Sequence, residues 1–567
     1  MSDTTSFPAG RPSIAGLILP YWRSADCWKA LAMLTIVLTI SFTTIYAYIA
    51  LNDVHGKVTD ALIKLDWPTL KPLLALTFGY GLITVLLPIT STILQDYLQL
   101  RWRTWLTHGL IKRWTGHLAY YQLERDGLLS NADQRIAEDT REFVESTLRL
   151  FINIVSVVAS TVSYTAVLWS LSGTLAFSVQ GVDVAIPGYM VIAAYGYSFA
   201  HLVVTHWLGK QLIGLNIHKQ TVEADFRFAG MQVRENAEQI AFYQGGRREG
   251  ERLSERFGRV RANTLQILVR TFKVMLGQSL FSHVFSLLPT LLALPLLLSG
   301  KISYGDMVRL IGAYGMLVGS LAFFQQAYQN FTQWMAWTNR LRDLLWSIDK
   351  ADNQMPGIYL STAPCALLRC TALTLHSPQH QPLTYLKSWQ VSPGERWLVH
   401  GPSGCGKSTL LRACAGLWPY GSGHINLPEQ RRSLFLPQRS YIPAGTLKAA
   451  LCYPAEPEQF TDAQCQQALE DCCLGDRRDA LSSSDRWQQV LSGGEQQRLA
   501  IGRVLLHRPE FIFLDEATSA LDPDTEAKLY HALIEQLPDS AIVSVAHRKA
   551  LEVFHPHHLD LARAGDH

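Results

Sequence analysis

The chain has 567 residues, which is too long for one ordinary domain, so we expect at least two. Only 17% of the residues are charged, 48% are hydrophobic and the mean hydropathy is +0.07, a balance unlike that of most soluble enzymes of this size. A net charge of +3 without a block of lysines and arginines argues against nucleic acid as a partner.

Long apolar runs in residues 1–350 predict an all-helical transmembrane domain with six spans. Each run is near the roughly 20 residues that cross a bilayer core. The fourth run has His201 and His206 near its end, and the sixth contains Asp306 and Arg309. The predicted spans lie at about 30–51, 70–94, 147–170, 185–208, 272–299 and 306–330.

Basic residues are distributed unevenly among the connections between the spans. The long connections after spans 2 and 4 are rich in lysine and arginine. The turn from Leu171 to Val184 contains neither, and the turn after span 5 contains only Lys301. Because cytoplasmic loops carry the excess of positive charge, we expect the long connections and both chain ends in the cytoplasm.

The same two connections, about 50 and 60 residues long, are far longer than ordinary interhelical turns. They are rich in helix formers with apolar residues at three-to-four spacing, which predicts helices that extend out of the membrane. Residues 131–139 and 233–243 mix charged and small side chains, and we interpret them as docking elements. The alternative is that they are solvated helix faces.

Some side chains in the later spans are polar or aromatic. We consider them candidates for the lining of a cargo pathway, with interhelical hydrogen bonds as the alternative. Gly315-x-x-x-Gly319 is interpreted as a helix-packing motif. The candidates are Tyr189, Tyr195, Tyr197, Gln278, His283, Gln325, Gln326, Tyr328, Gln329 and Asn330.

A segment with several prolines and a glycine at about 351–368 is interpreted as a linker, and residues 369–567 as a second, α/β domain. Of the nine cysteines only Cys27 precedes the linker, and the other eight lie in the linker or the second domain. No C-x-x-C or Cys/His pattern indicates a metal site, so we expect reduced thiols in a reducing compartment.

A predicted strand, a glycine-rich loop and a helix follow one another within residues 396–416. This is the context that a phosphate loop requires, because glycines let backbone N–H groups wrap phosphate oxygens at a helix N-terminus. In such a loop Lys407 reaches the β- and γ-phosphates and Ser408 supplies a hydroxyl to Mg²⁺. The predicted nucleotide-binding residues are Gly401, Pro402, Ser403, Gly404, Cys405, Gly406, Lys407, Ser408 and Thr409.

Cys405 lies within this loop, where amides and Lys407 are expected to lower the pKa of a thiol. One hypothesis is an alkylation-sensitive thiol that ATP shields. The other is a small residue that fills a permissive position.

Phe511 to Leu514 predicts a second buried strand that ends in two carboxylates. We assign Asp515 to the metal and Glu516 to the general base that takes a proton from the attacking water. Gln438 is assigned to sensing both Mg²⁺ and that water, and His547 to contact with the γ-phosphate.

The stretch Leu491-Ser-Gly-Gly-Glu-Gln-Gln-Arg498 lies between the phosphate loop and the acidic strand. Ser492, Gly493 and Gly494 are predicted to open a helix whose first amides meet a γ-phosphate. Because this helix is expected on the opposite side of the domain from the phosphate loop, that phosphate belongs to a facing subunit. Asp522 is expected to cross the same interface. The motifs therefore predict ATP and Mg²⁺ held between two chains.

These ordered motifs resemble those of ATP-binding cassette (ABC) transporters, and the chain as a whole is similar to a half-transporter with an exporter-like membrane domain fused ahead of the cassette. Four stretches of the chain resemble two related groups, the SbmA/BacA-like peptide-uptake permeases with an attached cassette (YddA-like) and the peroxisomal fatty-acyl half-transporters. The stretches are Leu168–Thr174, Ile186–Met190, Arg234–Tyr243 and Phe435–Arg439. The resemblance implies an ATP-hydrolysing homodimer that works by alternating access in a bacterial inner membrane.

The resemblance leaves cargo and direction open. Import of peptides or other large hydrophilic cargo is favoured by the SbmA/BacA likeness, and export of lipids, fatty-acyl compounds or drugs is the alternative. A third reading is an ATP-gated channel or regulator, against which the intact Glu516 and His547 argue. The chain departs from many cassettes at the adenine-stacking aromatic, where it has His376 and Ser377. Two alternatives follow: adenine selectivity is weak, or Tyr385 takes the place of the missing aromatic.

Overall fold

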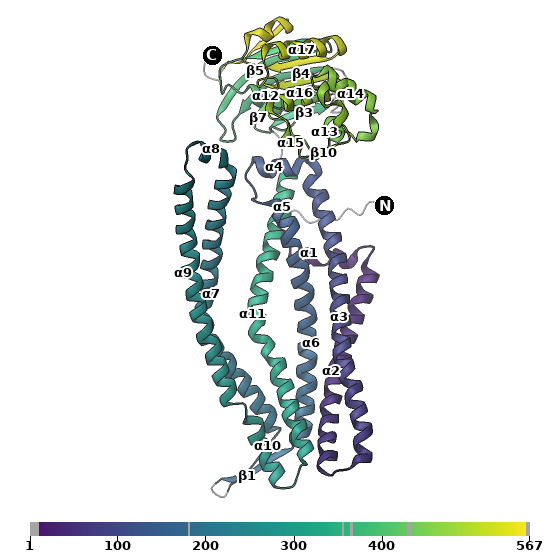
Figure 1. Cartoon of the computed structure of the whole chain (residues 1–567), viewed down its shortest axis with the longest axis vertical. Coiled ribbons are helices and arrows are strands. Elements are labelled where there is room, and N and C mark those ends of the chain that lie inside the picture. Colours follow the sequence, from purple (N-terminus) through teal and green to yellow (C-terminus); the bar gives the residue numbers. More distant parts are fainter. Residues whose placement is uncertain (1–10, 180–181, 354–356, 363–366, 428–432, 563–567) are drawn as a thin grey trace. The chain divides into compact units, whose positions relative to one another are not determined.

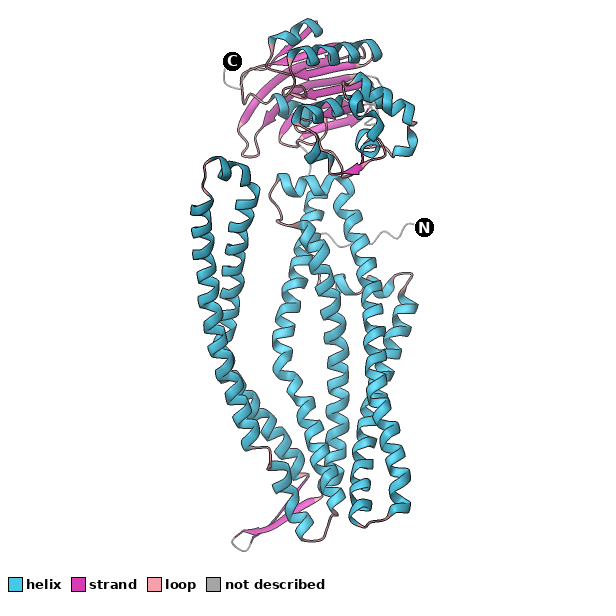
Figure 2. Cartoon of the chain, viewed as in Figure 1, coloured by secondary structure: helices cyan, strands magenta, loops and turns pink. Residues whose placement is uncertain are grey.

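The computed structural model describes residues 11–179, 182–353, 357–362, 367–427 and 433–562. The chain divides into two compact units, Met1–Asp352 and Asn353–His567. The first is built almost wholly of helices, and the second of two larger sheets with helices (Figures 1 and 2). Each unit is described below by itself.

Six long helices of 33 to 49 residues make up most of the first unit. At 1.5 Å per residue the longest span roughly 74 Å, well beyond the roughly 30 Å of a bilayer core, so they extend far outside it. The long helices are α2 (Cys27–Ile63), α3 (Trp67–Thr115), α6 (Thr140–Ser172), α7 (Tyr189–Glu235), α9 (Gly246–Val284) and α11 (Tyr304–Asp352). The short ones are α1 (Ile14–Ile18), α4 (Ala119–Arg125), α5 (Ala132–Gln134), α8 (Ala237–Phe242) and α10 (Leu288–Leu298), with 3₁₀ turns at Tyr21–Arg23 and Gly116–Leu118.

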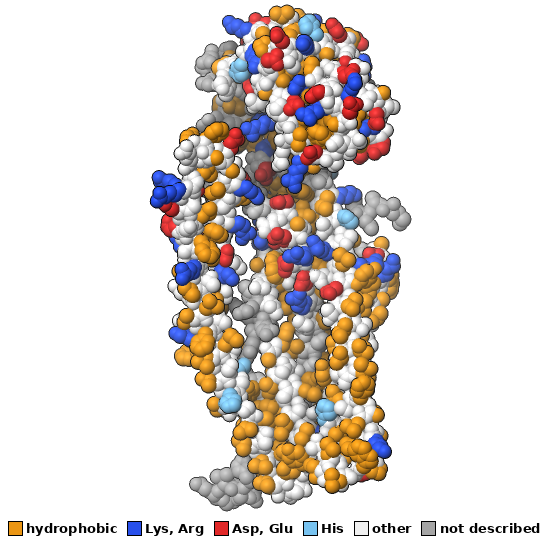
Figure 3. Space-filling view, in the orientation of Figure 1, with side chains coloured by type: hydrophobic (Ala, Val, Ile, Leu, Met, Phe, Trp, Pro, Cys, Tyr) orange, Lys and Arg blue, Asp and Glu red, His pale blue; other side chains and the backbone are white. Residues whose placement is uncertain are grey.

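The described residues contain five helices or helix runs that are long and apolar enough to cross a membrane, against the six spans predicted. Apolar side chains cover much of α2 and α3 in the lower part of Figure 3. The predicted fourth span, 185–208, is absent from the five. Its first residues belong to β2 (Val182–Pro187), which pairs antiparallel with β1 (Thr174–Val179). The five are Cys27–Ile63, Trp67–Arg125, Ala132–Ser172, Gly246–Leu298 and Tyr304–Phe323.

Helices α2 and α11 approach each other backbone to backbone. A Cβ added to Gly56 would lie 2.6 Å from the carbonyl oxygen of Gly305, so no larger residue fits there. Asp60 accepts hydrogen bonds from the Ser303 hydroxyl and the Gly305 amide, each at 2.7 Å. By contrast, a Cβ at Gly315 or Gly319 would meet nothing within 4 Å. The interpretation of those two glycines as the packing motif is therefore wrong within this chain.

The two predicted docking segments differ in burial. Residues 131–139 form α5 and a single π-helical turn, Arg135–Asp139, whose Ile136 and Asp139 are buried. Asp139 pairs with Arg340 of α11 at 2.9 Å, and burial raises the pKa of the Asp139 carboxyl. This segment therefore packs against its own unit. At the end of α8, Phe242 and the following Tyr243 are 79% and 86% exposed.

The second unit contains a parallel sheet of five strands in the order β13-β6-β12-β11-β8. Its neighbour is a four-stranded sheet in the order β3-β7-β4-β5. The expected linker differs from the structure, because β3 pairs with β7 and so belongs to the second sheet. The strands are β3 (Ile358–Thr362), β4 (Leu368–His376), β5 (Pro382–Val391), β6 (Arg396–His400), β7 (Gly421–Leu427), β8 (Ser433–Leu436), β11 (Phe511–Asp515), β12 (Ala541–Val545) and β13 (His557–Asp560).

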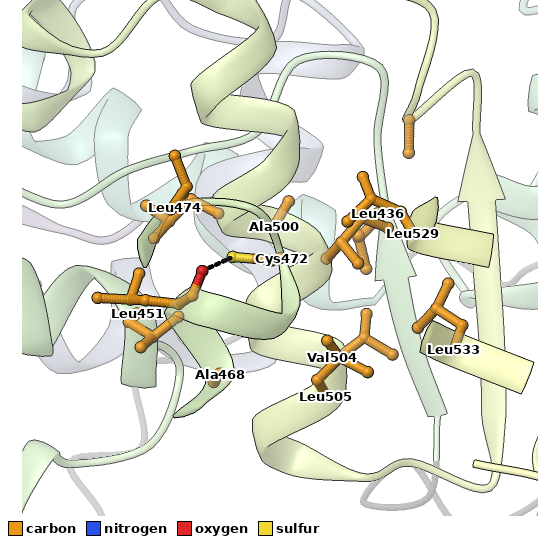
Figure 4. Packing of buried hydrophobic residues seen from close by; sticks show 14 of the residues in the cluster. Leu436, Leu451, Ala468, Cys472, Leu474, Ala500, Val504, Leu505, Leu529 and Leu533 are labelled. Atoms are coloured by element: carbon orange, nitrogen blue, oxygen red, sulfur yellow. Dashed lines mark hydrogen bonds between the residues drawn. The ribbon is translucent and has the colours of Figure 1, made fainter. Parts of the chain in front are cut away.

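Helices pack against the parallel sheet through one large apolar cluster (Figure 4). Leu529 and Leu533 of α17 contribute to it together with Val504 of α16 and Leu436 of β8. Cys472 is fully buried in the same cluster, where its Sγ donates to the carbonyl of Leu469. The helices of this unit are α12 (Lys407–Cys414), α13 (Leu447–Cys452), α14 (Asp462–Asp471), α15 (Trp487–Val490), α16 (Gly493–His507) and α17 (Pro523–Gln536). A two-stranded ladder joins β9 (Gly445–Thr446) to β10 (Ser484–Asp485).

The order of the parallel strands explains where the site forms. Since β6, β8, β11 and β12 all run in the same direction, their carboxyl ends meet at one edge of the sheet. The phosphate loop follows β6, Gln438 follows β8, the two carboxylates end β11, and His547 follows β12. Segments more than 100 residues apart in sequence therefore converge at this edge.

Candidate active site

The glycine-rich loop leads directly into α12, whose first residue is Lys407. Gly401, Gly404 and Gly406 have φ values of 147°, 81° and 103°, in the region that favours glycine. The Lys407 side chain is buried, and its Nζ donates to the carbonyls of Gly401 (2.7 Å) and Pro402 (3.1 Å). The ammonium is thus held against the loop whose amides are predicted to bind phosphate.

Cys405 has no exposed surface in this loop. A Cβ added to Gly401 would lie 2.8 Å from the Cys405 Sγ, so the thiol fills the space beneath the loop. This burial favours the interpretation of Cys405 as a small space-filling residue over that of a thiol open to alkylation.

Ser408 and Asp515 face each other at the metal position predicted from the sequence. The Ser408 hydroxyl donates to Asp515 Oδ1 at 2.8 Å. Burial raises the pKa of the Asp515 carboxyl, and the Ser408 hydrogen bond opposes that effect. A hydroxyl and a carboxylate oxygen are ligands that suit Mg²⁺, which is commonly held by few protein groups together with substrate phosphates. The donor set therefore fits. Among the described residues there is no group of three or more metal-binding side chains.

The three predicted catalytic residues lie together. Gln438 Nε2 donates to Glu516 Oε2 at 2.9 Å, and His547 Nε2 lies 3.3 Å from Glu516 Oε1. The Glu516 amide donates to the carbonyl of Val545, which ties the residue to the neighbouring strand. Glu516 has φ 51°, a left-handed conformation that costs a non-glycine residue about 1–2 kcal/mol. Strain of this kind concentrates at functional sites, where the surroundings impose it.

Ser492 and Asp522, both predicted to contact nucleotide, are N-caps in the isolated chain. Ser492 caps α16 in a reciprocal capping box, in which its amide donates to Glu495 at 2.8 Å. That backbone hydrogen bond lowers the pKa of the Glu495 carboxyl. The amides of Gly493 and Gly494 belong to the first turn, where a helix offers them no carbonyl. Asp522 caps α17 by accepting from the Thr525 amide at 2.9 Å.

Gln497 is a residue that the sequence reasoning missed. It is buried in α16, where its side-chain oxygen accepts from the amide of Ala520 at 2.9 Å. Its amide nitrogen donates to the Ser519 hydroxyl (3.3 Å) and the Gln438 carbonyl (3.5 Å). One side chain thus links the signature helix to the segments of Gln438 and Ser519.

Arg548, the residue after His547, was also missed. Its guanidinium donates to the carbonyls of Leu521 (2.8 Å) and Ser519 (3.0 Å). It also pairs with the buried Glu526 at 3.1 Å, whose other oxygen accepts from Thr518 at 2.6 Å. Gln497 lies within the quoted stretch Leu491–Arg498 and Arg548 follows the predicted His547, but their partners are largely backbone groups that a sequence pattern does not reveal.

Strand β5 passes beside the phosphate loop. A Cβ added to Gly406 would lie 3.4 Å from the Cβ of Leu383 and 3.8 Å from a methyl group of Thr384. The next residue, Tyr385, is 51% exposed. His376 ends β4, and its carbonyl accepts from the Trp418 indole at 2.9 Å. The choice of adenine-stacking residue stays a prediction between these candidates.

Comparisons with known proteins agree with the geometry. Residues 14–298 match the family described as ABC transporter transmembrane region 2, and residues 387–519 match the ABC transporter family. An uncharacterized ABC transporter ATP-binding protein of Haemophilus influenzae is 34% identical over 93% of this chain and 87% of its own length. The inner membrane ABC transporter ATP-binding protein YddA of Escherichia coli is 30% identical over 94% of each chain.

More distant relatives share the same organisation. The human lysosomal cobalamin transporter ABCD4 is 27% identical over 97% of this chain and 94% of its own. A solved bacterial Atm1-family ABC exporter with ATP bound has a TM-score of 0.71 and 18% identity over 95% of this chain and 94% of that one, which shows the fold. The chain belongs to the ABC transporters, as a half-transporter that fuses one transmembrane region to one ATP-hydrolysing cassette.

Proposed function

We propose that two copies of this chain form an ATP-driven importer of bulky hydrophilic cargo, such as peptides, in a bacterial inner membrane. The observation that carries the proposal is the meeting of Gln438, Glu516 and His547 at one sheet edge. A carboxylate held there can accept a proton from water, while the amide and the imidazole orient the water and the γ-phosphate. A chain that only gated a channel would not need this hydrolytic set.

The ATP site is proposed to be shared between the copies. Lys407 and Ser408 of one chain bind the phosphates, and the exposed first turn of α16, at Ser492 and Gly493, supplies amides to the same γ-phosphate from the other chain. Mg²⁺ bound at Ser408, Asp515 and Gln438 would neutralise phosphate charge. Closure of the two cassettes then depends on ATP, and hydrolysis releases them.

Helix α7 is proposed as the sixth crossing. It pairs with α9, where Gln278 donates to Thr205 at 3.1 Å and Asn263 donates to the carbonyl of Leu215 at 3.2 Å. Because α9 and α10 form a candidate span, a helix paired with α9 at this depth shares its membrane. The basic connections and both chain ends then lie in the cytoplasm with the cassette.

The exposed Phe242 and Tyr243 at the end of α8 are proposed to dock onto a cassette. Two adjacent exposed aromatic side chains, one at the end of a short helix and one directly after it, are anchors of the kind that protein interfaces use. Through such a contact the two cassette states bias two states of the membrane helices, which is alternating access.

Cargo class is inferred from the membrane region and from relatives. A cavity of about 370 Å³ is lined by apolar residues such as Leu202, Val318 and Leu321 together with Tyr195, Tyr197, Ser198, His201 and Ser282, and among the described residues no Asp, Glu, Lys or Arg lines it. An uncharged lining that is largely apolar, with a few hydroxyl and aromatic groups, suits a large uncharged or amphipathic cargo better than a small ion. One relative is named a cobalamin transporter, and cobalamin is itself bulky and polar.

Sidedness of transport tests the proposal. Right-side-out and inverted membrane vesicles would be supplied with ATP on the cassette side and with a labelled peptide on either side. We expect inward accumulation that requires Glu516. Outward movement of labelled lipid or drug instead would establish the exporter alternative. Cargo flux that persists with Glu516→Gln would establish gating without pumping.

A further inference from the structure

A groove of about 760 Å³ lies between α7 and α9, in the first unit. Its neighbourhood is fixed by two interhelical hydrogen bonds, Asn263 to Leu215 at one end and Gln278 to Thr205 at the other. Near the second bond the helices are in tight contact, since a Cβ on Gly277 would lie 2.4 Å from Leu208. At Gly214, within the groove, an added Cβ would meet nothing within 4 Å. The helices therefore leave room between them at this level.

The groove concentrates positive charge that the chain does not neutralise. Lys210, Arg270 and Lys273 line it, and none of them forms a salt bridge within the described part of the chain. No Asp or Glu occurs from residue 189 to 222 of α7 or from 256 to 284 of α9. The Nε of Arg270 is buried and has no hydrogen-bond partner among the described residues. Three cations in one groove call for an anionic occupant.

Apolar side chains adjoin the cations, most extensively on the side toward Gln278. Leu215 and Leu265 line one part of the groove. On the side toward Gln278, Val203, Trp207 and Leu276 are 51%, 68% and 46% exposed. A basic groove next to exposed apolar helix faces suits an amphipathic ligand. Its phosphate would bind in the groove and its acyl chains would lie along the neighbouring apolar faces.

We propose that this groove binds the headgroup of an anionic membrane phospholipid, with its phosphate among Lys210, Arg270 and Lys273 and its acyl chains along the exposed apolar faces of α7 and α9. The proposal rests on the proposed crossing of α7, which places these cations at the cytoplasmic boundary of the bilayer. There the inner leaflet supplies anionic lipid.

Native mass spectrometry of the full-length protein, released from nanodiscs that contain phosphatidylglycerol or only phosphatidylcholine, measures the bound lipid. We expect retained phosphatidylglycerol, retention that falls about fivefold for each of Lys210→Gln, Arg270→Gln and Lys273→Gln, and a larger loss in the groove triple variant that combines these three changes. The matched control is the triple variant Lys219→Gln, Arg247→Gln and Arg248→Gln, which removes the same charge from exposed positions on α7 and α9 and should retain lipid. Equal retention by the groove and control triple variants would overturn the proposal.

Two further experiments would identify other occupants of the groove. Glycerol phosphate that displaces the lipid completely would show a free-anion site and overturn the lipid assignment. A Gly214→Cys variant that resists maleimide in lipid-free detergent, but reacts after dissociation into monomers, would show that a second copy covers the groove. We expect protection by phosphatidylglycerol and by nothing else. Lipid retention is measured without ATP or cargo. The lipid proposal can therefore be tested even if the transport proposal fails.

Discussion

Arg548 Nη1 lies 3.1 Å from Glu526 Oε2, and the same guanidinium holds the carbonyls of Ser519 and Leu521. Arg548 follows His547, the predicted γ-phosphate contact, whereas Ser519 and Leu521 directly precede Asp522, which is expected to cross the interface with the facing subunit. A single side chain therefore connects the segment on one side of the predicted nucleotide to the segment that crosses the interface. We infer that Arg548 positions both.

Arg548→Met should lower the free energy of unfolding of the cassette by about 2 kcal/mol, because it leaves the buried Glu526 without its charged partner. The effect is smaller than for a fully buried pair because the Arg548 side chain is 40% exposed. Turnover should fall more than ATP affinity, since the phosphate loop is untouched. Chemical denaturation and steady-state kinetics on the same variants check both effects.

Glu526→Gln, alone and combined with Arg548→Met, completes a double-mutant cycle for this pair. The double variant should lose less stability than the sum of the two single variants. Strict additivity would contradict the inferred coupling. A fall in ATP affinity equal to the fall in turnover would contradict a positioning role.

Glu516→Gln should retain ATP binding and lose at least about 100-fold in turnover, as expected on removal of a general base. The cassettes should then stay closed on ATP, which size-exclusion chromatography with ATP would detect. Glu535→Gln, an exposed glutamate on α17, is the matched control and should be neutral. If Glu516→Gln kept turnover within tenfold of wild type, another group would have to be the general base.

The shared site predicts complementation between two inactive chains. Lys407→Ala should lose nucleotide binding, and Ser492→Arg should block the first turn of α16. A mixed dimer of the two chains assembles one undamaged site from Lys407 of one copy and Ser492 of the other. Some ATPase activity should therefore return in tagged heterodimers and be absent in either homodimer. Activity in a strictly monomeric preparation would refute the arrangement.

The chemistry at the sheet edge was largely predictable from sequence because the phosphate loop, Gln438, the two carboxylates and His547 each stand at the carboxyl end of a parallel strand. Once the strands share a direction, the positions of Lys407, Asp515 and Gln438 follow from the register of the sheet. The contacts of Gln497 and Arg548 were not predictable, because their partners include carbonyls and amides that carry no sequence signal.

The membrane half was less predictable. Hydropathy located five of the spans, but polar and aromatic residues such as Tyr197 and His201 dilute the apolar run of α7, and the β1–β2 hairpin precedes it. A close contact between helices lies at Gly56 and Gly305, which no spacing rule indicated, while a Cβ at Gly315 or Gly319 would meet no described atom within 4 Å. Among the candidate pathway residues, the side chains of 324–329 lie outside the described residues.

Gly56→Ala should destabilise the membrane unit by about 1–3 kcal/mol, because its Cβ would lie 2.6 Å from the Gly305 carbonyl oxygen and close to the stem of Arg309. The matched control is Gly79→Ala on α3, where a Cβ meets nothing within 4 Å. Thermal unfolding in detergent should separate the two variants. A Gly56→Ala protein as stable as the control would mean that α2 and α11 are further apart.

His555 predicts a pH dependence of cassette stability. It is buried, and its ring Nδ1 lies 2.8 Å from the Leu551 carbonyl and its Nε2 2.9 Å from the Ser544 hydroxyl. Burial lowers the pKa of His555 to about 4 from an ordinary value of 6.5. Between these values the unfolded chain binds the proton and the folded chain does not, so stability is full above pH 6.5 and falls as the pH drops toward 4.

The loss should reach about 3 kcal/mol for a shift of this size. Urea unfolding of the wild type at a series of pH values measures it. His555→Leu should be less stable at pH 7.5, because Ser544 loses a partner, but should show a shallower slope between pH 6.5 and 4. The exposed His531→Leu serves as control and should keep the wild-type slope. An unchanged slope in His555→Leu would assign the acid sensitivity to other groups.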